Sequence, residues 1–170
     1  MNREQKLVAI GASSGVAVMI GALIGLSGVM PSLPITADSG DRLAFAAKWL
    51  ALAAAPVFLA IIAVGNARFF SEAIDPTRGA EDRSMTIIGR VADNTTQQLL
   101  LLLIGSLALA VQLPAGQLQV VGAAAIVFAF MRVAFWIGYR IHPLYRAFGF
   151  AGTAYLNLGL LVASAWLALG

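Results

Sequence analysis

The hydrophobic positions of the chain fall into five long runs that are separated by shorter polar segments. A helix needs about 20 predominantly apolar residues to cross the hydrocarbon core of a bilayer. The pattern therefore predicts five transmembrane helices, and Pro56 predicts a kink in the second of them. The helices are expected over Leu7 to Met30, Leu43 to Gly65, Leu99 to Leu113 (starting a turn or two earlier, between Ile87 and Thr96), Gln117 to Tyr139, and Ala147 to Leu169.

The composition excludes a water-soluble fold. Hydrophobic residues make up 60% of the 170 residues and charged residues only 11%, whereas soluble domains carry about a quarter charged residues. In lipid, such a chain satisfies its backbone groups by forming helices, so we expect an all-α, polytopic transmembrane bundle in contact with membrane lipids. Cysteine is absent and histidine occurs once, which argues against disulfides and against a Cys- or His-based metal site.

The basic residues predict the orientation of the bundle. They lie between the apolar runs rather than in a soluble patch, so membrane orientation explains them better than a nucleic-acid partner. With the N-terminus in the cytoplasm, two of them, Arg42 and Lys48, fall toward the outer side. Because Lys and Arg favour cytoplasmic segments, we expect a multi-pass inner-membrane protein with its C-terminus outside. Eight basic residues then lie at the inner side: Arg3, Lys6, Arg68, Arg78, Arg83, Arg90, Arg140 and Arg146.

Arg132 is the most unusual residue, because it lies in the apolar run Val120 to Gly138, which holds no acidic residue. A guanidinium at membrane depth costs several kcal/mol unless it meets water, a partner or a ligand. At helical spacing it shares a face with Tyr139. Polar groups that accept its charge are therefore expected inside the protein.

A second polar group opens the third predicted helix. Arg90, Asn94 and Gln97 follow one another at i, i+4 and i+7 and share a face, with Asp93 beside it. In the structural interpretation Asp93 pairs with Arg132, since buried charges are usually paired. In the functional interpretation the arginines bind the carboxylates of an anionic or amphipathic ligand. Both interpretations are open at this point, and the residue types alone favour the structural one.

Small and polar residues elsewhere predict helix packing. Gly11 and Gly15, and again Gly21 and Gly25, are small residues four positions apart in the first helix. This spacing allows close helix approach, and contacts within one chain explain it better than a dedicated dimer motif. Asn157 in the fifth helix is expected to donate an interhelical hydrogen bond.

The motif Arg90-xxx-Asn94-xx-Gln97, followed by Arg132-Val133-Ala134-xxxx-Tyr139 at the end of the next helix, resembles the MAPEG family. These are membrane-associated proteins of eicosanoid and glutathione metabolism. The resemblance implies a bacterial-type member with a four-helix core over residues 43–170 and an additional N-terminal transmembrane helix and outer loop over residues 1–42. It also implies a homotrimer that binds glutathione between neighbouring subunits near the cytoplasmic face.

The resemblance further implies roles for individual residues in a glutathione-dependent transferase or peroxidase acting on apolar electrophiles. A nearby guanidinium or hydroxyl stabilises the glutathione thiolate, and arginines and amides hold the carboxylates of the peptide. The implied thiolate-stabilising residues are Arg132, Tyr139 and Arg146, and the implied glutathione-binding residues are Arg68, Arg90, Asn94 and Gln97.

The chain also departs from the family pattern. Gln97 stands where the family often has glutamate, and Asp93 stands where eicosanoid members have a basic residue. Ala147 and Phe150 replace an expected serine and tyrosine, and Arg146 lies one residue out of register. These departures support an alternative in another class, namely a non-catalytic structural or lipid-binding subunit of a larger membrane assembly.

Overall fold

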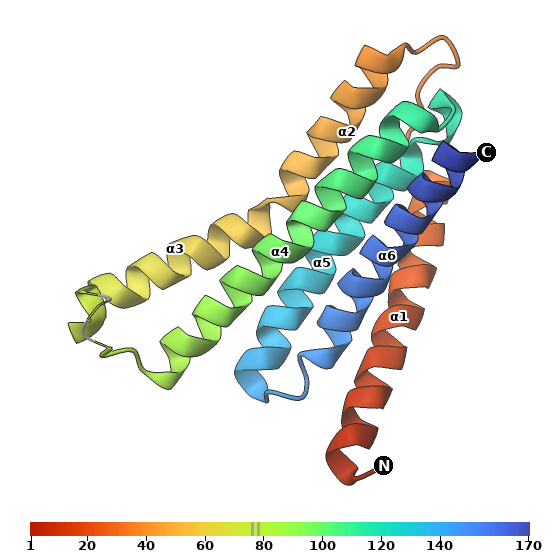
Figure 1. Cartoon of the computed structure of the whole chain (residues 1–170). Coiled ribbons are helices and arrows are strands. Elements are labelled where there is room, and N and C mark those ends of the chain that lie inside the picture. Colours follow the sequence, from red (N-terminus) through yellow and green to blue (C-terminus); the bar gives the residue numbers. More distant parts are fainter. Residues whose placement is uncertain (76, 78) are drawn as a thin grey trace.

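The protein is a bundle of long helices (Figure 1). The computed structural model describes residues 1–75, 77 and 79–170. Within these residues, five helical segments are long and apolar enough to cross a membrane, so the predicted all-α, five-span architecture is confirmed. The helices are α1 (Arg3–Val29), α2 (Ser39–Ala53), α3 (Ala55–Phe69), α4 (Arg83–Gln112), α5 (Gln119–Ile141) and α6 (Ala147–Leu169), with short 3-10 turns at Glu72–Ile74 and Ala115–Gln117.

The second span is divided into α2 and α3 by a bend at Ala54. Pro56 lies in the first turn of α3, where a missing backbone N–H leaves no helical hydrogen bond unmade. The predicted kink is confirmed, and α3 diverges from the rest of the bundle (Figure 1). As a result α2 contacts both α4 and α5, whereas α3 lies mainly against α4.

Helix α5 occupies the centre of the bundle, in contact with α1, α2, α4 and α6. The first turns of its buried face are built largely from small residues, including the fully buried run Ala123 to Ala125. Small side chains let the neighbouring backbones approach closely. Helix α5 therefore presents its larger residues, Arg132 and Tyr139 among them, to α4 and α6 at one end of the bundle.

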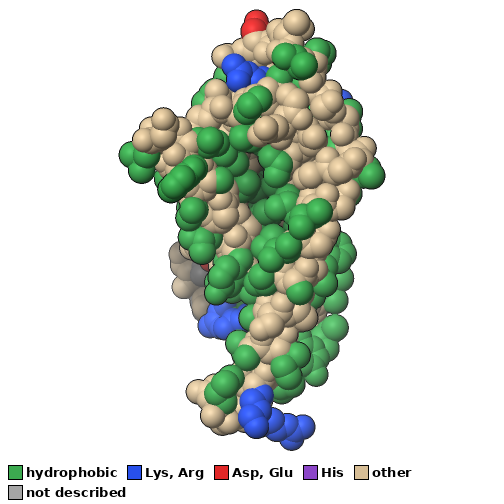
Figure 2. Space-filling view, turned by 90° about the vertical axis from the view of Figure 1, so that its right-hand side faces the viewer, with side chains coloured by type: hydrophobic (Ala, Val, Ile, Leu, Met, Phe, Trp, Pro, Cys, Tyr) green, Lys and Arg blue, Asp and Glu red, His purple; other side chains and the backbone are tan. Residues whose placement is uncertain are grey.

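That end also carries the N-terminus, the α3–α4 connection and the α5–α6 turn, whereas the C-terminus lies at the opposite end (Figure 1). On the α1 side of the molecule, charged side chains gather toward the two ends and leave a largely apolar band between them (Figure 2). Arg78, which was expected at the basic end, lies outside the described residues.

Helix α4 begins four residues before the earliest predicted start. Asp82 caps it, with Oδ1 accepting a hydrogen bond from the backbone N–H of Met85 at 2.7 Å. Such a cap satisfies one of the free donors of the first turn. The polar stretch that follows is therefore part of a rigid helix, and Arg90 and Asn94 lie on it one turn apart.

Two glycines of α1 allow it to pack closely against α6. An added Cβ at Gly11 would lie 3.4 Å from the Cβ of Ala147, and one at Gly15 would lie 2.9 Å from the carbonyl carbon of Phe148. The predicted close packing within one chain is thus confirmed for this pair. It does not hold for Gly21 and Gly25, where an added Cβ would meet no atom within 4 Å.

Replacing Gly15 by alanine is expected to loosen α1 from α6. The new methyl group would overlap the backbone carbonyl of Phe148, which cannot move without shifting the helix. Overpacking of this kind lowers the free energy of unfolding by about 2 kcal/mol. Thermal unfolding in detergent measures the loss, with Gly21→Ala as the control in the open part of the same helix. Equal stability of the two variants would show that α1 does not pack this closely.

Candidate functional site

Arg132 is buried where α4, α5 and α6 meet, with 1% of its surface exposed. Its Nη1 donates a hydrogen bond to Asn94 Oδ1 on α4 at 2.8 Å. Its Nη2 donates to two groups on α6, the carbonyl oxygen of Gly149 at 3.2 Å and the hydroxyl of Thr153. The guanidinium carbon also lies 4.4 Å from the ring centroid of Phe135. Arg132 therefore links three helices through neutral groups.

The predicted ion pair between Asp93 and Arg132 is wrong. Asp93 is exposed and lines a pocket between α3 and α4, and within the described part of the chain no carboxylate forms an ion pair with Arg132. Neighbouring helix positions differ by about 100° in direction, so Asn94 points at Arg132 and Asp93 does not. The buried charge is compensated by an amide, a hydroxyl, a carbonyl and an aromatic face.

A cluster of polar groups surrounds the Tyr139 side chain. The Tyr139 hydroxyl oxygen accepts a hydrogen bond from Arg90 Nη1 at 3.4 Å. The guanidinium carbon of Arg146, at the start of α6, lies 4.8 Å from the centroid of the Tyr139 ring. Phe135 packs edge-on against the same ring, with the centroids 5.8 Å apart. Tyr139 thus lies between two guanidinium groups, one from α4 and one from α6.

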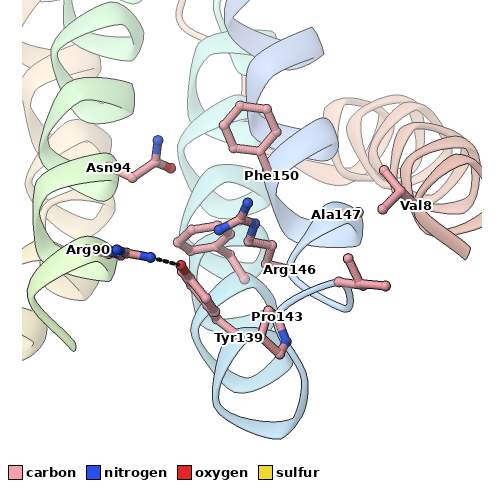
Figure 3. A pocket seen from close by; sticks show the side chains of 10 residues that line it. Val8, Arg90, Asn94, Tyr139, Pro143, Arg146, Ala147 and Phe150 are labelled. Carbon is pink, nitrogen blue, oxygen red and sulfur yellow. Dashed lines mark hydrogen bonds between the residues drawn. The ribbon is translucent and has the colours of Figure 1, made fainter. Parts of the chain in front are cut away.

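These residues line a pocket of about 430 Å³ near the end of the bundle that carries the N-terminus. Figure 3 shows α4 on one side of it, the end of α5 and the α5–α6 turn at its centre, and α1 on the far side. Its lining combines two guanidinium groups, one amide and one phenol with two phenylalanine rings and aliphatic surface. The lining residues are Val8, Arg90, Asn94, Phe135, Tyr139, Pro143, Leu144, Arg146, Ala147 and Phe150.

Four of the seven predicted site residues, Arg90, Asn94, Tyr139 and Arg146, line this pocket. Arg132 does not line the pocket but contacts two residues that do, Asn94 and Phe135.

Two predicted site residues lie elsewhere. Arg68 lines the pocket between α3 and α4, where its Nη2 pairs with Glu81 Oε1 at 2.5 Å, and Gln97 is exposed on α4. The neighbouring Gln98 points inward instead, and its Oε1 accepts a hydrogen bond from Asn157 Nδ2 at 2.8 Å. The expected interhelical role of Asn157 is confirmed.

Sequence reasoning missed three contributors, namely Gly149, Thr153 and Val8. Gly149 and Thr153 are one helical turn apart on α6 and face Arg132. A threonine four residues after a glycine in an apolar helix is a weak signal for such a site. Val8 belongs to a helix that the expected four-helix core does not include.

Comparison with protein-family models gives one match, described as the MAPEG family, over residues 46–166. This range covers more than half of the chain and runs from α2 to near the end of α6. The chain belongs to the MAPEG family. Neither the curated proteins nor the solved structures compared with it gave a significant match. The MAPEG domain contains the last four spans, and α1 precedes it as an additional helix.

Proposed function

We propose that this MAPEG protein binds glutathione in the Arg90–Tyr139–Arg146 pocket and uses its thiolate against apolar electrophiles, as a transferase or a peroxidase. The observation that carries the proposal is the placement of two guanidinium groups, an amide and a phenol against aliphatic walls in one pocket. Glutathione has two carboxylates for the cations, and its thiol must meet an apolar partner. Arginines hold carboxylates with charge-assisted, often bidentate hydrogen bonds.

Asn94 has a defined orientation in this site. Arginine can only donate hydrogen bonds, so the amide oxygen must be the atom that faces Arg132. The amide nitrogen is then the group that Asn94 offers to a ligand in the pocket. A donor fixed in this way favours a peptide carbonyl or carboxylate of the ligand.

The Tyr139 hydroxyl is arranged to stabilise a thiolate. Its oxygen accepts the hydrogen bond from Arg90, so its own proton remains available for donation to sulfur. The charge of Arg146, over the same ring, favours the anionic form of a thiol nearby. The thiolate then attacks an electrophilic carbon, and the leaving group departs with its bonding electrons as the carbon–sulfur bond forms. With a peroxide as the substrate, the thiolate attacks one oxygen, the O–O bond breaks, the departing alkoxide takes a proton, and the sulfur is oxidised to a sulfenic acid.

The position of Asp93 bears on the alternative of a non-catalytic subunit. An acid beside a glutathione carboxylate would oppose binding, but Asp93 lines the pocket between α3 and α4 rather than the Tyr139 pocket. Ala147 and Phe150 do line the Tyr139 pocket, so the hydroxyls that the family pattern expects there are missing. In the proposal Tyr139 supplies the hydroxyl instead.

The proposal includes assembly as a homotrimer with the site near subunit boundaries. Arg68, a predicted ligand-binding residue, lines the pocket between α3 and α4, which shares Arg90 with the Tyr139 pocket. In the proposed trimer we expect Arg68 to face the glutathione of a neighbouring subunit. Chemical cross-linking in native membranes tests the assembly, and a ladder that ends at three subunits is the expected result.

The proposed orientation in an inner membrane has a direct test. Because basic residues favour the cytoplasmic side, alkaline phosphatase fused after Gly170 is expected to be active and a green fluorescent protein fused there to be dark. The same two fusions at the N-terminus are expected to give the reverse result. Active phosphatase at the N-terminus would overturn the orientation and place the pocket at the outer side.

Glutathione binding to the purified protein tests the function. We expect saturable binding and thiolate absorbance at a lower pH than for free glutathione. Tyr139→Phe is expected to retain binding and to lower kcat by about 100-fold, the usual cost of one lost donor to a developing anion. A folded protein that does not bind millimolar glutathione would contradict the proposal and favour a structural subunit.

A further inference from the structure

Helix α1 lies outside the MAPEG domain, yet one of its residues, Val8, lines the Tyr139 pocket. Figure 3 shows Val8 pointing from α1 toward the start of α6, on the side of the pocket opposite Arg90 and Asn94. We propose that α1 forms the apolar wall of the site and that Val8 limits the size of the electrophile's apolar group. This inference rests on the proposed function and extends it to substrate selection.

The position of Val8 is fixed from both sides along α1. Asn2 and Gln5 form a reciprocal capping box, with hydrogen bonds of 2.8 and 2.9 Å, that starts the helix at Arg3. One turn after Val8, Gly11 packs against Ala147 at the start of α6. Capping and close packing hold the first turns in one place. Val8 is therefore a fixed part of the wall rather than a side chain on a fraying terminus.

The chemistry places the electrophile beside this wall. A thiolate stabilised by Tyr139 and Arg146 must lie near the start of α6, where Arg146 and Ala147 are adjacent. The reacting carbon then lies within bonding distance of that sulfur, with its apolar substituent directed away from the cations. The apolar surfaces available to the substituent are those of Val8, Phe135, Pro143, Leu144, Ala147 and Phe150. Of these, only Val8 comes from outside the family domain.

The absence of cysteine permits a direct test with single-cysteine variants of the full chain. In Val8→Cys, the rate of modification by N-ethylmaleimide reports access to the wall. Leu7→Cys is the matched control, because Leu7 lies at the same level of the same helix with 41% of its surface exposed, against 38% for Val8, and does not line the Tyr139 pocket. The probes are S-methylglutathione and S-hexylglutathione, which carry no free thiol to consume the reagent.

S-hexylglutathione at about ten times its Kd is expected to slow modification of Val8→Cys about tenfold, the factor set by site occupancy. S-methylglutathione at equal occupancy should slow it less than about twofold, because its substituent does not reach α1. Neither probe should change the rate for Leu7→Cys. If S-hexylglutathione binds, as shown by a thermal shift, but leaves Val8→Cys as reactive as before, the wall proposal is overturned. If neither probe binds at all, the proposed glutathione function fails first, and the wall proposal falls with it.

A second variant tests selection itself. Val8→Phe is expected to lower kcat/KM for electrophiles with long alkyl groups by about 10- to 100-fold, the range for a poorly fitting group in an apolar pocket. The loss should be at least about tenfold larger for these electrophiles than for the smallest one, so the ratio of the two kcat/KM values reports selection. Leu7→Phe should leave both kcat/KM values as in the parent. An equal loss for small and large electrophiles would indicate damage to the fold and would overturn a role in selection.

Discussion

Replacing Asn94 by aspartate is expected to stabilise the protein and, at the same time, to abolish tight glutathione binding. Arg132 is a buried cation with neutral partners, and Asn94 Oδ1 lies 2.8 Å from its Nη1. A carboxylate at this position turns a neutral acceptor into a charged one, and hydrogen bonds between charged groups are about twice as strong. We expect the free energy of unfolding to rise by about 1 kcal/mol, because burial of the new charge offsets part of the gain.

The same change places a second carboxylate oxygen where the amide nitrogen faced the pocket. It removes a donor and adds a charge that repels the carboxylates of glutathione. Loss of a hydrogen bond to a charged group costs about 2 to 3 kcal/mol, so the Kd should rise by about 100-fold. Thermal unfolding and glutathione titration of one purified variant measure both effects. A residue with only a structural role would not move stability and affinity in opposite directions.

Two further variants isolate the contact with Arg132. In an Arg132→Met background, Asn94→Asp should no longer stabilise the protein, since the cation is gone, and the double-mutant cycle gives the coupling energy. Gln97→Glu adds the same charge to the same helix on an exposed position and should leave the stability unchanged. A stabilisation by Gln97→Glu as large as that by Asn94→Asp would show a general effect of charge rather than the predicted contact.

The apolar runs were sufficient to predict the helical architecture, because a backbone in lipid must satisfy its own hydrogen bonds. The helix boundaries were less predictable where polar residues continue a helix beyond its apolar part. Helix α4 starts at Arg83, well before the apolar run Leu99 to Leu113, because Asp82 caps it there. Its first turns lie at the end of the bundle and carry site residues such as Arg90. Hydropathy does not distinguish such a segment from a connecting loop.

The sequence was sufficient to predict which types of side chain form the site, but not which side chains contact one another. The sequence indicates that Arg132 needs polar partners, and the spacing indicates that Asn94 is near. Whether Asn94 or Asp93 faces the guanidinium depends on the rotation of α4 about its own axis, because neighbouring helix positions differ by about 100° in direction. Packing of α4 against α5 and α6 sets that rotation. The carbonyl oxygen of Gly149 could not be predicted from residue types, because every residue has one. The role of Val8 depends on where α1 packs against the bundle. The small residues of α1 indicate which face packs closely, but they do not indicate which helix it packs against.

Replacing Gly149 by alanine is expected to have the largest effect on the fold. An added Cβ at this position would overlap the carbonyl oxygen of Met131 and the amide nitrogen of Phe135, and would lie 2.7 Å from Phe135 Cα. All three atoms belong to the backbone of α5, which cannot rotate away as a side chain can. Helices α5 and α6 would have to separate, at a cost of about 3 kcal/mol or more in unfolding free energy.

The separation would also reach the site, because the Gly149 carbonyl oxygen accepts a hydrogen bond from Arg132 Nη2. When α6 moves away, Arg132 loses its acceptors on α6, and its hydrogen bond to Asn94 is no longer held in the same geometry. Glutathione binding should therefore weaken together with the stability of the fold. Gly159→Ala is the matched control on the same helix, since an added Cβ there meets no atom within 4 Å. It should be neutral or stabilising by up to about 1 kcal/mol, because alanine favours a helix more than glycine does. Thermal unfolding of both variants in the same detergent measures the difference in stability. A Gly149→Ala protein as stable as Gly159→Ala would contradict the close α5–α6 contact on which the position of Arg132 depends.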